Sequence, residues 1–385
     1  MKKNNLAISI KKLEKYLLNK SKRLHDPIFF GNEVRYLKKC IDTGFVSYVG
    51  KYVEKFEKKL CSFTRSKYAV ATSSGTAALH LILNYLKISE NDEVLLPGYT
   101  YVATANAIKY CKGTPNFLDI EKETLGVCPN KLQKYLKKIS ITKNNKTFNK
   151  YTNKQIKALI VVHVYGFSSK VFEIKKICKN YNIHLIEDAA EAVGSFYKKR
   201  HLGTLSDFGI LSFNGNKTIT TGGGGAILVK KKSIANKLKH LSTHAKQKVK
   251  YDHQHNEIGY NYRMINLAAA VGCAQLENLR KILAAKRKIF KTYVNIFEKI
   301  NDIKIMEEPN NCRSNYWLIT VLFKNKKVKK KFIAILNQRG IGLRYTWRPL
   351  NSLKIFRNCP SDNLTNSKSI FDRTLNLPSS PSLSL

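Results

Sequence analysis

Short apolar segments alternate with helical segments between residues 67 and 187, and this alternation constrains the fold more than any other feature. The predicted strands are residues 67–72, 93–97, 116–119, 158–164 and 183–187. The predicted helices between them are residues 77–86, 102–110 and 171–180. Strands that are connected through helices pair in parallel, because the helix carries the chain back to the starting edge. We therefore expect an α/β fold with a mostly parallel sheet flanked by helices.

The remaining segments predict parts outside this alternation. Helical spacing at residues 32–60 breaks near 43–50, and predicted strands at 208–213 and 226–229 flank a glycine-rich turn. The segment at 142–154 contains mostly Lys, Asn and Thr, so we expect a surface loop there. A nearly unbroken helical pattern covers residues 266–300, followed by a strand at 316–323, a helix at 328–339 and a proline-rich tail.

These segments predict four parts of the chain. A helix as long as the one at 266–300 usually bridges two lobes. The parts are an N-terminal extension at 1–31, a large domain at 32–265, the connecting helix at 266–300 and a small C-terminal α+β domain at 301–385.

The chain is strongly basic, with 69 Lys and Arg residues against 26 Asp and Glu residues and a formal net charge of +43. Such a charge can indicate a nucleic acid, an anionic membrane surface or an acidic ligand. The lysines are spread along the whole length, and no helix-turn-helix, zinc or basic-aromatic RNA motif accompanies them. We interpret the charge as compositional bias and expect no nucleic-acid partner.

Cysteine spacing and hydropathy bear on the location of the protein. None of the eight cysteines forms a CxxC pair, so we expect reduced thiols and no metal site. The first 20 residues lack the continuous apolar stretch of a signal peptide, and no apolar run approaches the length of a membrane-spanning helix. A cytoplasmic protein without membrane contact is the expectation.

The segment at 212–225, SFNGNKTITTGGGG, is the strongest candidate for chemistry. It places Lys217 between the end of a strand and four consecutive glycines. Glycines in a row cost backbone entropy, so they are typical of places where the backbone approaches a ligand or takes a positive φ. The alternative is a flexible hairpin turn.

Two further segments place polar groups at the ends of predicted strands. In IEDAAEAVG, at 186–194, Asp188 follows an apolar strand at the edge where ligands of open α/β sheets bind. Its alternative is an N-cap of a following helix. In SSGTAALH, at 73–80, small residues open a helix whose first N–H groups can bind a phosphate, although an ordinary capped turn has the same appearance.

Together these groups suit pyridoxal phosphate. Its aldehyde needs an amine for a Schiff base, and its ring nitrogen needs a carboxylate. Its phosphate needs N–H and hydroxyl donors, and its ring needs a flat aromatic face, for which Tyr99 and Tyr101 lie near.

The chain from about Asn32 to its C-terminus resembles the fold-type I, pyridoxal-phosphate-dependent sugar aminotransferases of the DegT/DnrJ/StrS family. The matching motifs are GTAALHL (75–81), YTYVATANAI (99–108), EDAAEAVGS (187–195), SFNGNKTITTGGGG (212–225) and GYNYRMINLAAAVGCAQLE (259–277). The stretch at 40–57 and the form NGNK are similar to the branch that makes 4-amino-4,6-dideoxy sugars for legionaminic acid and bacillosamine-type pathways.

The resemblance implies a role for each matching residue. Lys217 would form the Schiff base and move the proton, Asp188 would pair with the ring nitrogen, and Tyr101 would stack on the ring. The phosphate would be held by Gly75, Thr76 and Ser212, and by Asn261 of the neighbouring subunit in a homodimer. Arg344 and Trp347 would contact the substrate.

The sequence departs from the family pattern at two of these places. Glu191 stands where Gln is frequent, which would bring a second carboxylate near the cofactor, and Tyr345 follows Arg344 where Pro is frequent. His163, in VHVYG, would either orient the cofactor or pack at a strand end, and we favour packing.

The resemblance implies an aminotransferase for surface-glycan or nonulosonic-acid sugars. Glutamate would donate nitrogen to a 4-keto-6-deoxy hexose linked to UDP or GDP. One alternative is a dehydratase of the same fold, in which a His replaces the Schiff-base lysine. Another is a regulatory or nucleic-acid-binding protein that keeps the fold.

Overall fold

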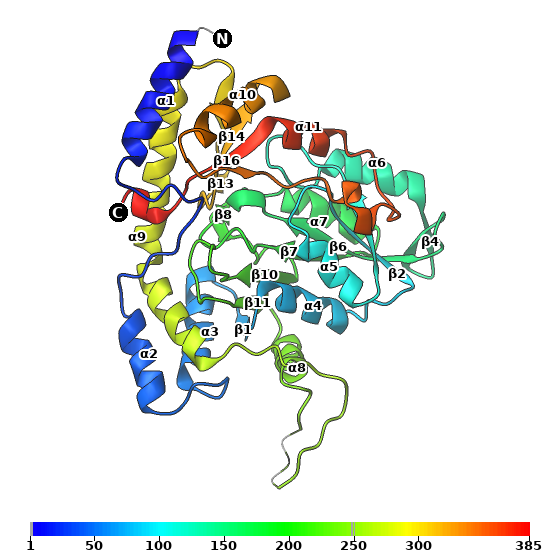
Figure 1. The fold of residues 1–385 in the computed structure, drawn as a ribbon. Coiled ribbons are helices and arrows are strands. Elements are labelled where there is room, and N and C mark those ends of the chain that lie inside the picture. The colour runs from blue at the N-terminus through cyan, green and yellow to red at the C-terminus, as the bar shows by residue number, and fades with distance from the viewer. Residues whose placement is uncertain (1–2, 248, 250) are drawn as a thin grey trace.

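The computed structural model describes residues 3–247, 249 and 251–385, and its centre is a large sheet between two layers of helices (Figure 1). The main strand order is β1-β11-β10-β7-β6-β2-β3. Pairing is parallel from β10 to β3, and β11 is antiparallel to both of its neighbours. This confirms the expected mostly parallel sheet. Its strands are β1 (Tyr68–Thr72), β2 (Asp92–Pro97), β3 (Thr114–Leu118), β6 (Gln155–Val162), β7 (His184–Asp188), β10 (Phe208–Ser212) and β11 (Gly225–Val229).

Both faces of this sheet are buried, which explains the continuous apolar runs in the sequence. In β6, Ile160 and Val162 belong to one apolar cluster, and Leu159 and Val161 belong to the other. The first cluster is covered by α4 (Gly75–Tyr85), α5 (Ala103–Tyr110) and α8 (Lys232–Ser242). The second is covered by α3 (Lys51–Thr64), α6 (Pro129–Ile139), α7 (Val171–Asn180) and the first half of α9 (Asn266–Phe297).

Helix α9 links the large sheet to a second, smaller sheet (Figure 1). Its first half packs against α3 and α2 (Glu33–Asp42), and the helical break expected near residues 43–50 separates those two helices. The small sheet has the order β12-β14-β16-β15. Its elements are β12 (Ile303–Ile305), β14 (Ile319–Phe323), α10 (Lys326–Asn337), β15 (Arg344–Tyr345), α11 (Thr365–Arg373) and β16 (Thr374–Leu377).

The N-terminal helix α1 (Lys3–Leu17) lies alongside α9 (Figure 1). Leu6, Ile10, Leu13 and Leu17 are buried in the same apolar cluster as the small sheet. The Tyr16 hydroxyl also donates a hydrogen bond to a backbone carbonyl near the C-terminus, at 3.3 Å. The end of helix α1 therefore contacts the C-terminal segment of the chain.

Two expectations about local structure are wrong, and one small sheet was not expected. The expected loop at 142–154 contains part of a hairpin of β4 (Ser140–Lys143) and β5 (Lys146–Asn149), which pairs with β6. The expected proline-rich tail contains helix α11 and strand β16, an inner strand of the small sheet. A third sheet was not predicted at all, because its strands have only two residues each: β8 (Phe196–Tyr197), β9 (Arg200–His201) and β13 (Cys312–Arg313).

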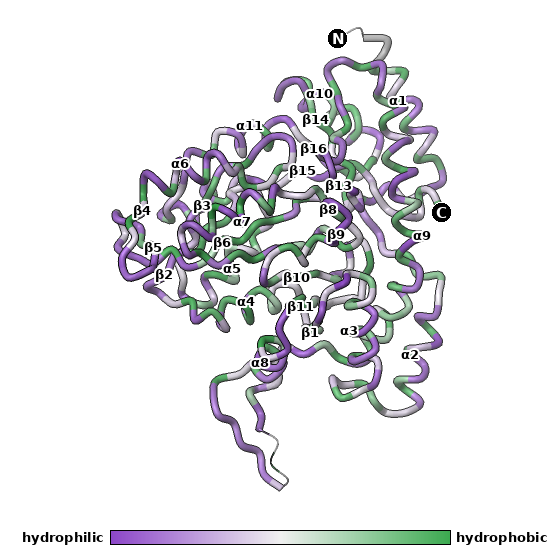
Figure 2. Tube along the Cα trace, turned by 180° about the vertical axis from the view of Figure 1, so that it is seen from behind, coloured by the Kyte–Doolittle hydropathy of each residue, from purple (hydrophilic) through white to green (hydrophobic). Residues whose placement is uncertain are grey.

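A long connection between α8 and α9 projects away from the body of the molecule (Figure 1). Bridges between Thr243 and Asn261, and between Lys246 and His255, make its base an antiparallel hairpin. Figure 2 shows that its outer part is mainly hydrophilic, in contrast to the apolar strands of the sheet. We call residues 243–263 the projecting hairpin.

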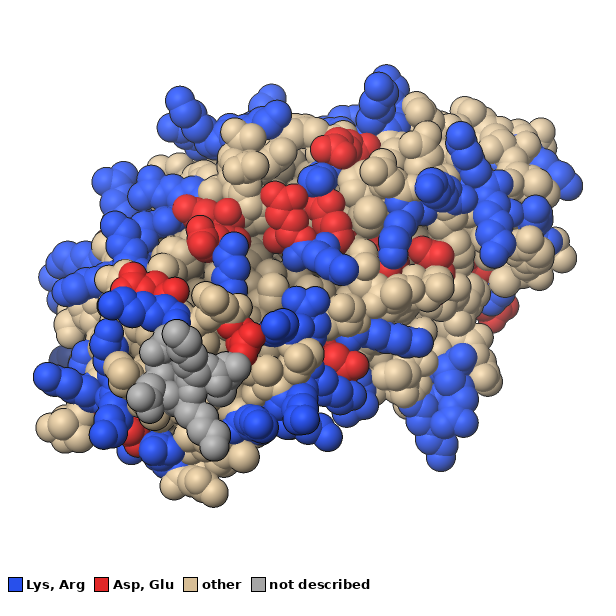
Figure 3. All heavy atoms as spheres, turned by 90° about the horizontal axis from the view of Figure 1, so that it is seen from above, with Lys and Arg blue, Asp and Glu red and all other residues tan. Residues whose placement is uncertain are grey.

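Basic side chains are spread over the surface. Figure 3 shows Lys and Arg across the whole of one face, with smaller groups of Asp and Glu between them. Within the part of the chain that the structure describes, no helix combines the length and apolar character needed to cross a membrane.

Candidate active site

A cavity of about 340 Å³ opens at the carboxyl ends of β7 and β10. The predicted site residues lining it are Gly75, Thr76, Tyr101, Asp188, Glu191, Ser212, Lys217, Arg344 and Trp347. The small sheet contributes Arg344, so the cavity lies where the two sheets meet. Parallel topology places the ends of β7 and β10 at one edge of the large sheet, and the packing of the small sheet adds Arg344 to that edge.

Lys217 lies in a tight turn just beyond β10, where its backbone N–H donates to the carbonyl of Asn214 at 2.9 Å. Its Nζ is 3.9 Å from Oε1 of Glu191 and 4.0 Å from the ring centroid of Trp317. Burial lowers the pKa of Lys217; the nearby carboxylates of Glu191 and Asp188 oppose this effect. A lysine with a lowered pKa supplies more of the neutral amine that attacks an aldehyde.

Asp188 is the last residue of β7, and its side chain is buried. One carboxylate oxygen accepts from the Thr104 hydroxyl at 2.9 Å, and the other accepts from the Ala190 N–H at 3.1 Å. Burial raises the pKa of Asp188, and these hydrogen bonds and Lys217 counteract the rise. Residues 189–195 form turns, so the alternative that Asp188 caps a helix is wrong.

The N-terminus of α4 forms one end of the cavity. Ser74 caps the helix, and its hydroxyl accepts from the Ala77 N–H at 3.0 Å. The first N–H groups of a helix have no acceptor within the helix and attract anions. A Cβ on Gly75 would lie only 3.0 Å from the Cβ of Ser212, so glycine lets the helix end approach Ser212 closely.

The last two glycines of the run, Gly224 and Gly225, are closely packed, so this part of the run is not a free hairpin. A Cβ on Gly225 would lie 2.4 Å from the backbone carbon of Ser74, and one on Gly224 would lie 2.2 Å from the Thr221 hydroxyl. Gly222 has a φ of +80°, which favours glycine. The absence of side chains at these glycines lets the turn between β1 and α4 approach the segment that contains Lys217.

Aromatic rings and Arg344 form the opposite wall. The Trp347 ring lies 5.2 Å from that of Tyr101 and 5.9 Å from that of Tyr165, with which it is stacked. The Arg344 guanidinium lies 4.6 Å from the Trp347 centroid. Nε and Nη2 of Arg344, and Nε1 of Trp347, are buried without a hydrogen-bond partner within the described chain. Buried donors of this kind are normally satisfied, so a ligand with acceptor oxygens fits this wall.

The cavity meets each chemical need of pyridoxal phosphate. Lys217 offers an amine, Asp188 a buried carboxylate, and the α4 terminus with Ser212 offers donors for a phosphate. Tyr101, a residue that is 53% exposed, offers an aromatic face. No cluster of metal-ligating side chains occurs among the residues that the structure describes.

The sequence analysis did not predict several of the residues that line the cavity. Thr104, in the first turn of α5, binds Asp188, and Trp317 covers Lys217. The chain has only two tryptophans, Trp317 and Trp347, and both line the cavity. The scarcity of tryptophan was the sequence signal that could have pointed to Trp317. Thr104 has no comparable signal in the sequence around it.

His163 packs beneath the site and does not line the cavity. Its Nε2 is 3.0 Å from Oε2 of Glu187, and its Nδ1 accepts from the Ser169 N–H at 3.2 Å. Glu187 also accepts from the backbone N–H groups of residues 203, 205 and 206. Burial would raise the pKa of Glu187, but these hydrogen bonds and His163 lower it overall. His163 and Glu187 therefore stabilise the position of the turn at residues 203–206 against β7.

Asn261 is the predicted site residue that lies apart from the cavity. It is exposed and pairs with Thr243 at the base of the projecting hairpin. Within one chain it does not contribute to the site.

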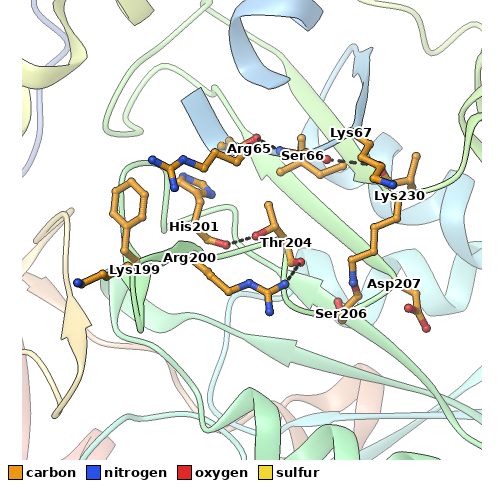
Figure 4. Close-up of a pocket in the computed structure, with 15 residues that line it drawn as sticks. Arg65, Ser66, Lys67, Lys199, Arg200, His201, Thr204, Ser206, Asp207 and Lys230 are labelled. Carbon is orange, nitrogen blue, oxygen red and sulfur yellow. Dashed lines mark hydrogen bonds between the residues drawn. The ribbon is translucent and has the colours of Figure 1, made fainter. Parts of the chain in front are cut away.

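A second cavity, of about 310 Å³, lies at the opposite end of β10 (Figure 4). Its basic residues are Arg65, Lys67, Lys199, Arg200 and Lys230. Lys230 donates to the carbonyl of Ser206, and Arg200 donates to that of Thr204 at 3.3 Å (Figure 4). Two of its cations therefore bind the protein's own backbone, and none of the predicted site residues lies here.

Comparison with known proteins agrees with this geometry. The chain is 37% identical over 339 residues to EpsN of Bacillus subtilis (strain 168), an aminotransferase by name, covering 88% of this chain and 84% of that protein. It is 34% identical over 361 residues to GDP-perosamine synthase of Escherichia coli O157:H7, covering 94% of each. The aminotransferase TlmJ of Streptoalloteichus hindustanus shares the fold, with a TM-score of 0.83, 22% identity and 93% of each chain covered.

The family model that matches spans residues 30–385, which includes every lining residue of the cavity. Amino-group transfer in this family depends on pyridoxal phosphate, and the cavity holds the amine, carboxylate and phosphate-binding donors that this cofactor needs. The chain belongs to the DegT/DnrJ/EryC1/StrS aminotransferase family.

Proposed function

We propose that the protein transfers an amino group from glutamate to a 4-keto-6-deoxy hexose linked to a nucleoside diphosphate, for a surface glycan or nonulosonic acid. The meeting of Lys217 and Asp188 in one buried cavity carries this proposal. Relatives support the substrate class: besides GDP-perosamine synthase, a UDP-4-amino-4,6-dideoxy-N-acetyl-beta-L-altrosamine transaminase of Campylobacter jejuni is 32% identical over 336 residues, covering 86% of this chain and 85% of that one.

Lys217 would hold the cofactor through its aldehyde and then carry the proton between cofactor and substrate carbon. Its amine suits both tasks, because burial lowers its pKa. Asp188 would keep the ring nitrogen protonated, and Thr104 and Ala190 fix the carboxylate for that contact. When bound, the cofactor supplies the electron sink for the transfer.

The other lining residues would bind and orient. The phosphate would lie against Gly75, Thr76 and Ser212, and Tyr101 would stack on the ring. Glu191 is fixed by the Tyr165 N–H, which donates to it at 2.8 Å, and it faces Lys217. Arg344 and Trp347 would contact the substrate through their unpartnered N–H groups.

The test is a half-reaction. The protein is loaded with pyridoxamine phosphate and mixed with GDP- and UDP-linked 4-keto-6-deoxy hexoses, and the visible absorbance of the pyridoxal form is followed. We expect at least one nucleotide sugar to restore the absorbance, and 2-oxoglutarate to do so in the reverse of the glutamate step. Restoration by 2-oxoglutarate alone would leave an aminotransferase with a different acceptor.

We also propose a homodimer in which Asn261 of each chain reaches the phosphate of the other. Asn261 supports this because it is exposed on the projecting hairpin and lies outside the cavity of its own chain. If it binds a phosphate, that phosphate would belong to a second chain. On serial dilution, activity and dimer mass should decline together. Asn261→Ala should weaken cofactor binding, whereas Asn256→Ala, farther out on the same hairpin, should not. A fully active monomer contradicts the proposal.

A further inference from the structure

The strand ladder of the small sheet stops beside the active-site cavity. Strands β14 and β16 pair antiparallel, and the first pair at this end is Ile319 with Leu377. In the same register, Leu318 would come next, opposite Pro378, and Trp317 would then lie opposite Ser379. These residues do not pair: the Ser379 N–H donates instead to the Leu24 carbonyl at 2.7 Å, and the Trp317 N–H donates to Oδ1 of Asn315 at 2.9 Å.

A buried lysine lies between the backbone carbonyls of Trp317 and Ser379, which have no partner in the β14–β16 ladder. Lys286, in the middle of α9, is fully buried. Its Nζ donates to the carbonyl of Trp317 at 2.7 Å and to that of Ser379. An amine in the interior is costly unless it satisfies groups that would otherwise lack a donor. Lys286 thus supplies the donors that a continued ladder would have supplied.

The consequence of ending the ladder here is the position of Trp317. Trp317 does not pair with β16 and makes three other hydrogen bonds. Its backbone N–H donates to Asn315, and its carbonyl accepts from Lys286. Its indole N–H donates to the Asn216 carbonyl at 2.7 Å. Asn216 is the residue before Lys217, and the Trp317 ring lies over the Lys217 amine. The contact therefore runs from α9 through Trp317 to the lysine at the centre of the site.

We propose that Lys286 is a positioning residue, which ends the β14–β16 ladder and thereby holds the Trp317 indole against Lys217. The argument rests on the proposed function only in treating Lys217 as the cofactor lysine. The structural part, that Lys286 positions Trp317, stands without any cofactor.

The first test therefore uses the protein without cofactor. Trp347→Phe leaves Trp317 as the sole tryptophan. In this background we expect Lys286→Met, which keeps the length and removes the donors, to make Trp317 fluorescence several-fold more sensitive to acrylamide quenching. The matched control is Lys329→Met. Lys329 is also buried and donates to a carbonyl of the small domain, that of Phe371, at 2.7 Å, but its amine lies over the rings of Tyr345 and Phe371, whereas that of Lys286 binds Trp317. Burial lowers the pKa of both lysines, and that of Lys329 falls to about 8.

The second test measures cofactor binding. Lys286→Met should weaken pyridoxal phosphate binding roughly tenfold, the size of effect that the loss of about one strong hydrogen bond produces. Because Lys286 acts through Trp317, the same substitution should have little further effect in a Trp317→Ala background. If Lys286→Met does not fold, Lys286→Gln, which keeps N–H donors on a shorter side chain, replaces it with a smaller expected effect.

The results separate the two proposals. Equal quenching in the Lys286 and Lys329 variants overturns the positioning role. An unmodified protein that binds no pyridoxal phosphate overturns the proposed function, while the quenching result still decides the role of Lys286.

Discussion

Lys217→Ala is expected to abolish amino transfer, with turnover falling by at least about 10⁴-fold. The substitution removes both the amine that would hold the cofactor and the group that would move the proton. Its effect on folding should be small, because Lys217 makes no close side-chain hydrogen bond and its nearest carboxylate oxygen is 3.9 Å away. Steady-state turnover, visible absorbance and mass after borohydride reduction measure the outcome.

Lys230→Ala is the matched control. Lys230 is an exposed lysine that directly follows the next strand, β11, and its amine binds the Ser206 carbonyl in the second cavity (Figure 4). This variant should keep its turnover and should retain the added mass of a reduced cofactor. A Lys217→Ala protein that turns over at the unmodified rate would show that another group performs the chemistry.

Asp188→Asn is expected to lower turnover by about 10²- to 10³-fold while leaving the cofactor attached to Lys217. Asn has nearly the same shape, and its side-chain oxygen can still accept one of the two hydrogen bonds that Thr104 and Ala190 donate. It lacks the negative charge, so the ring nitrogen would lose its proton and the electron sink would weaken. The measurements are the pre-steady-state rate of the half-reaction and the visible absorbance of the bound cofactor.

Asp207→Asn provides the comparison, because Asp207 is an exposed carboxylate at the other end of the sheet, in the second cavity. We expect it to behave like the unmodified protein. If Asp188→Asn also reacts at the unmodified rate, the carboxylate serves only to fix Thr104 and the turn that follows β7.

The main sheet and the centre of the site could be predicted from short stretches of sequence. Strand β6 is buried on both faces, so its apolar run is visible without knowledge of its neighbours. Asp188 ends such a strand and Lys217 lies shortly after another, and parallel topology brings those two strand ends to one edge. The expected roles of these residues remain proposals that the variants above test.

The strands that were not predicted from the sequence have only short or weak hydrophobic patterns. Strand β16 contains the buried polar residues Thr374 and Asn376, and the latter donates to the Thr320 hydroxyl at 2.9 Å. Its apolar residues, Leu375 and Leu377, alternate with these polar ones over only four positions, which is a short signal. Its stability comes from strands β14 and β15 on either side. The hairpin of β4 and β5 was missed because its residues are mainly polar; four residue pairs join its two strands, and one pair joins β5 to β6.

The sequence by itself determined the alternating order of strands and helices, and with it the edge where Lys217 and Asp188 meet, because backbone direction and apolar patterning act over a few residues. Only the tertiary structure decided which side chains complete the cavity. Thr104 reaches Asp188 across 84 residues, and Trp317 reaches Asn216 across 101. Lys286 joins Trp317 to Ser379, which is 93 residues away from it. Contacts at such separations depend on how whole layers pack against one another, and no local pattern records that packing.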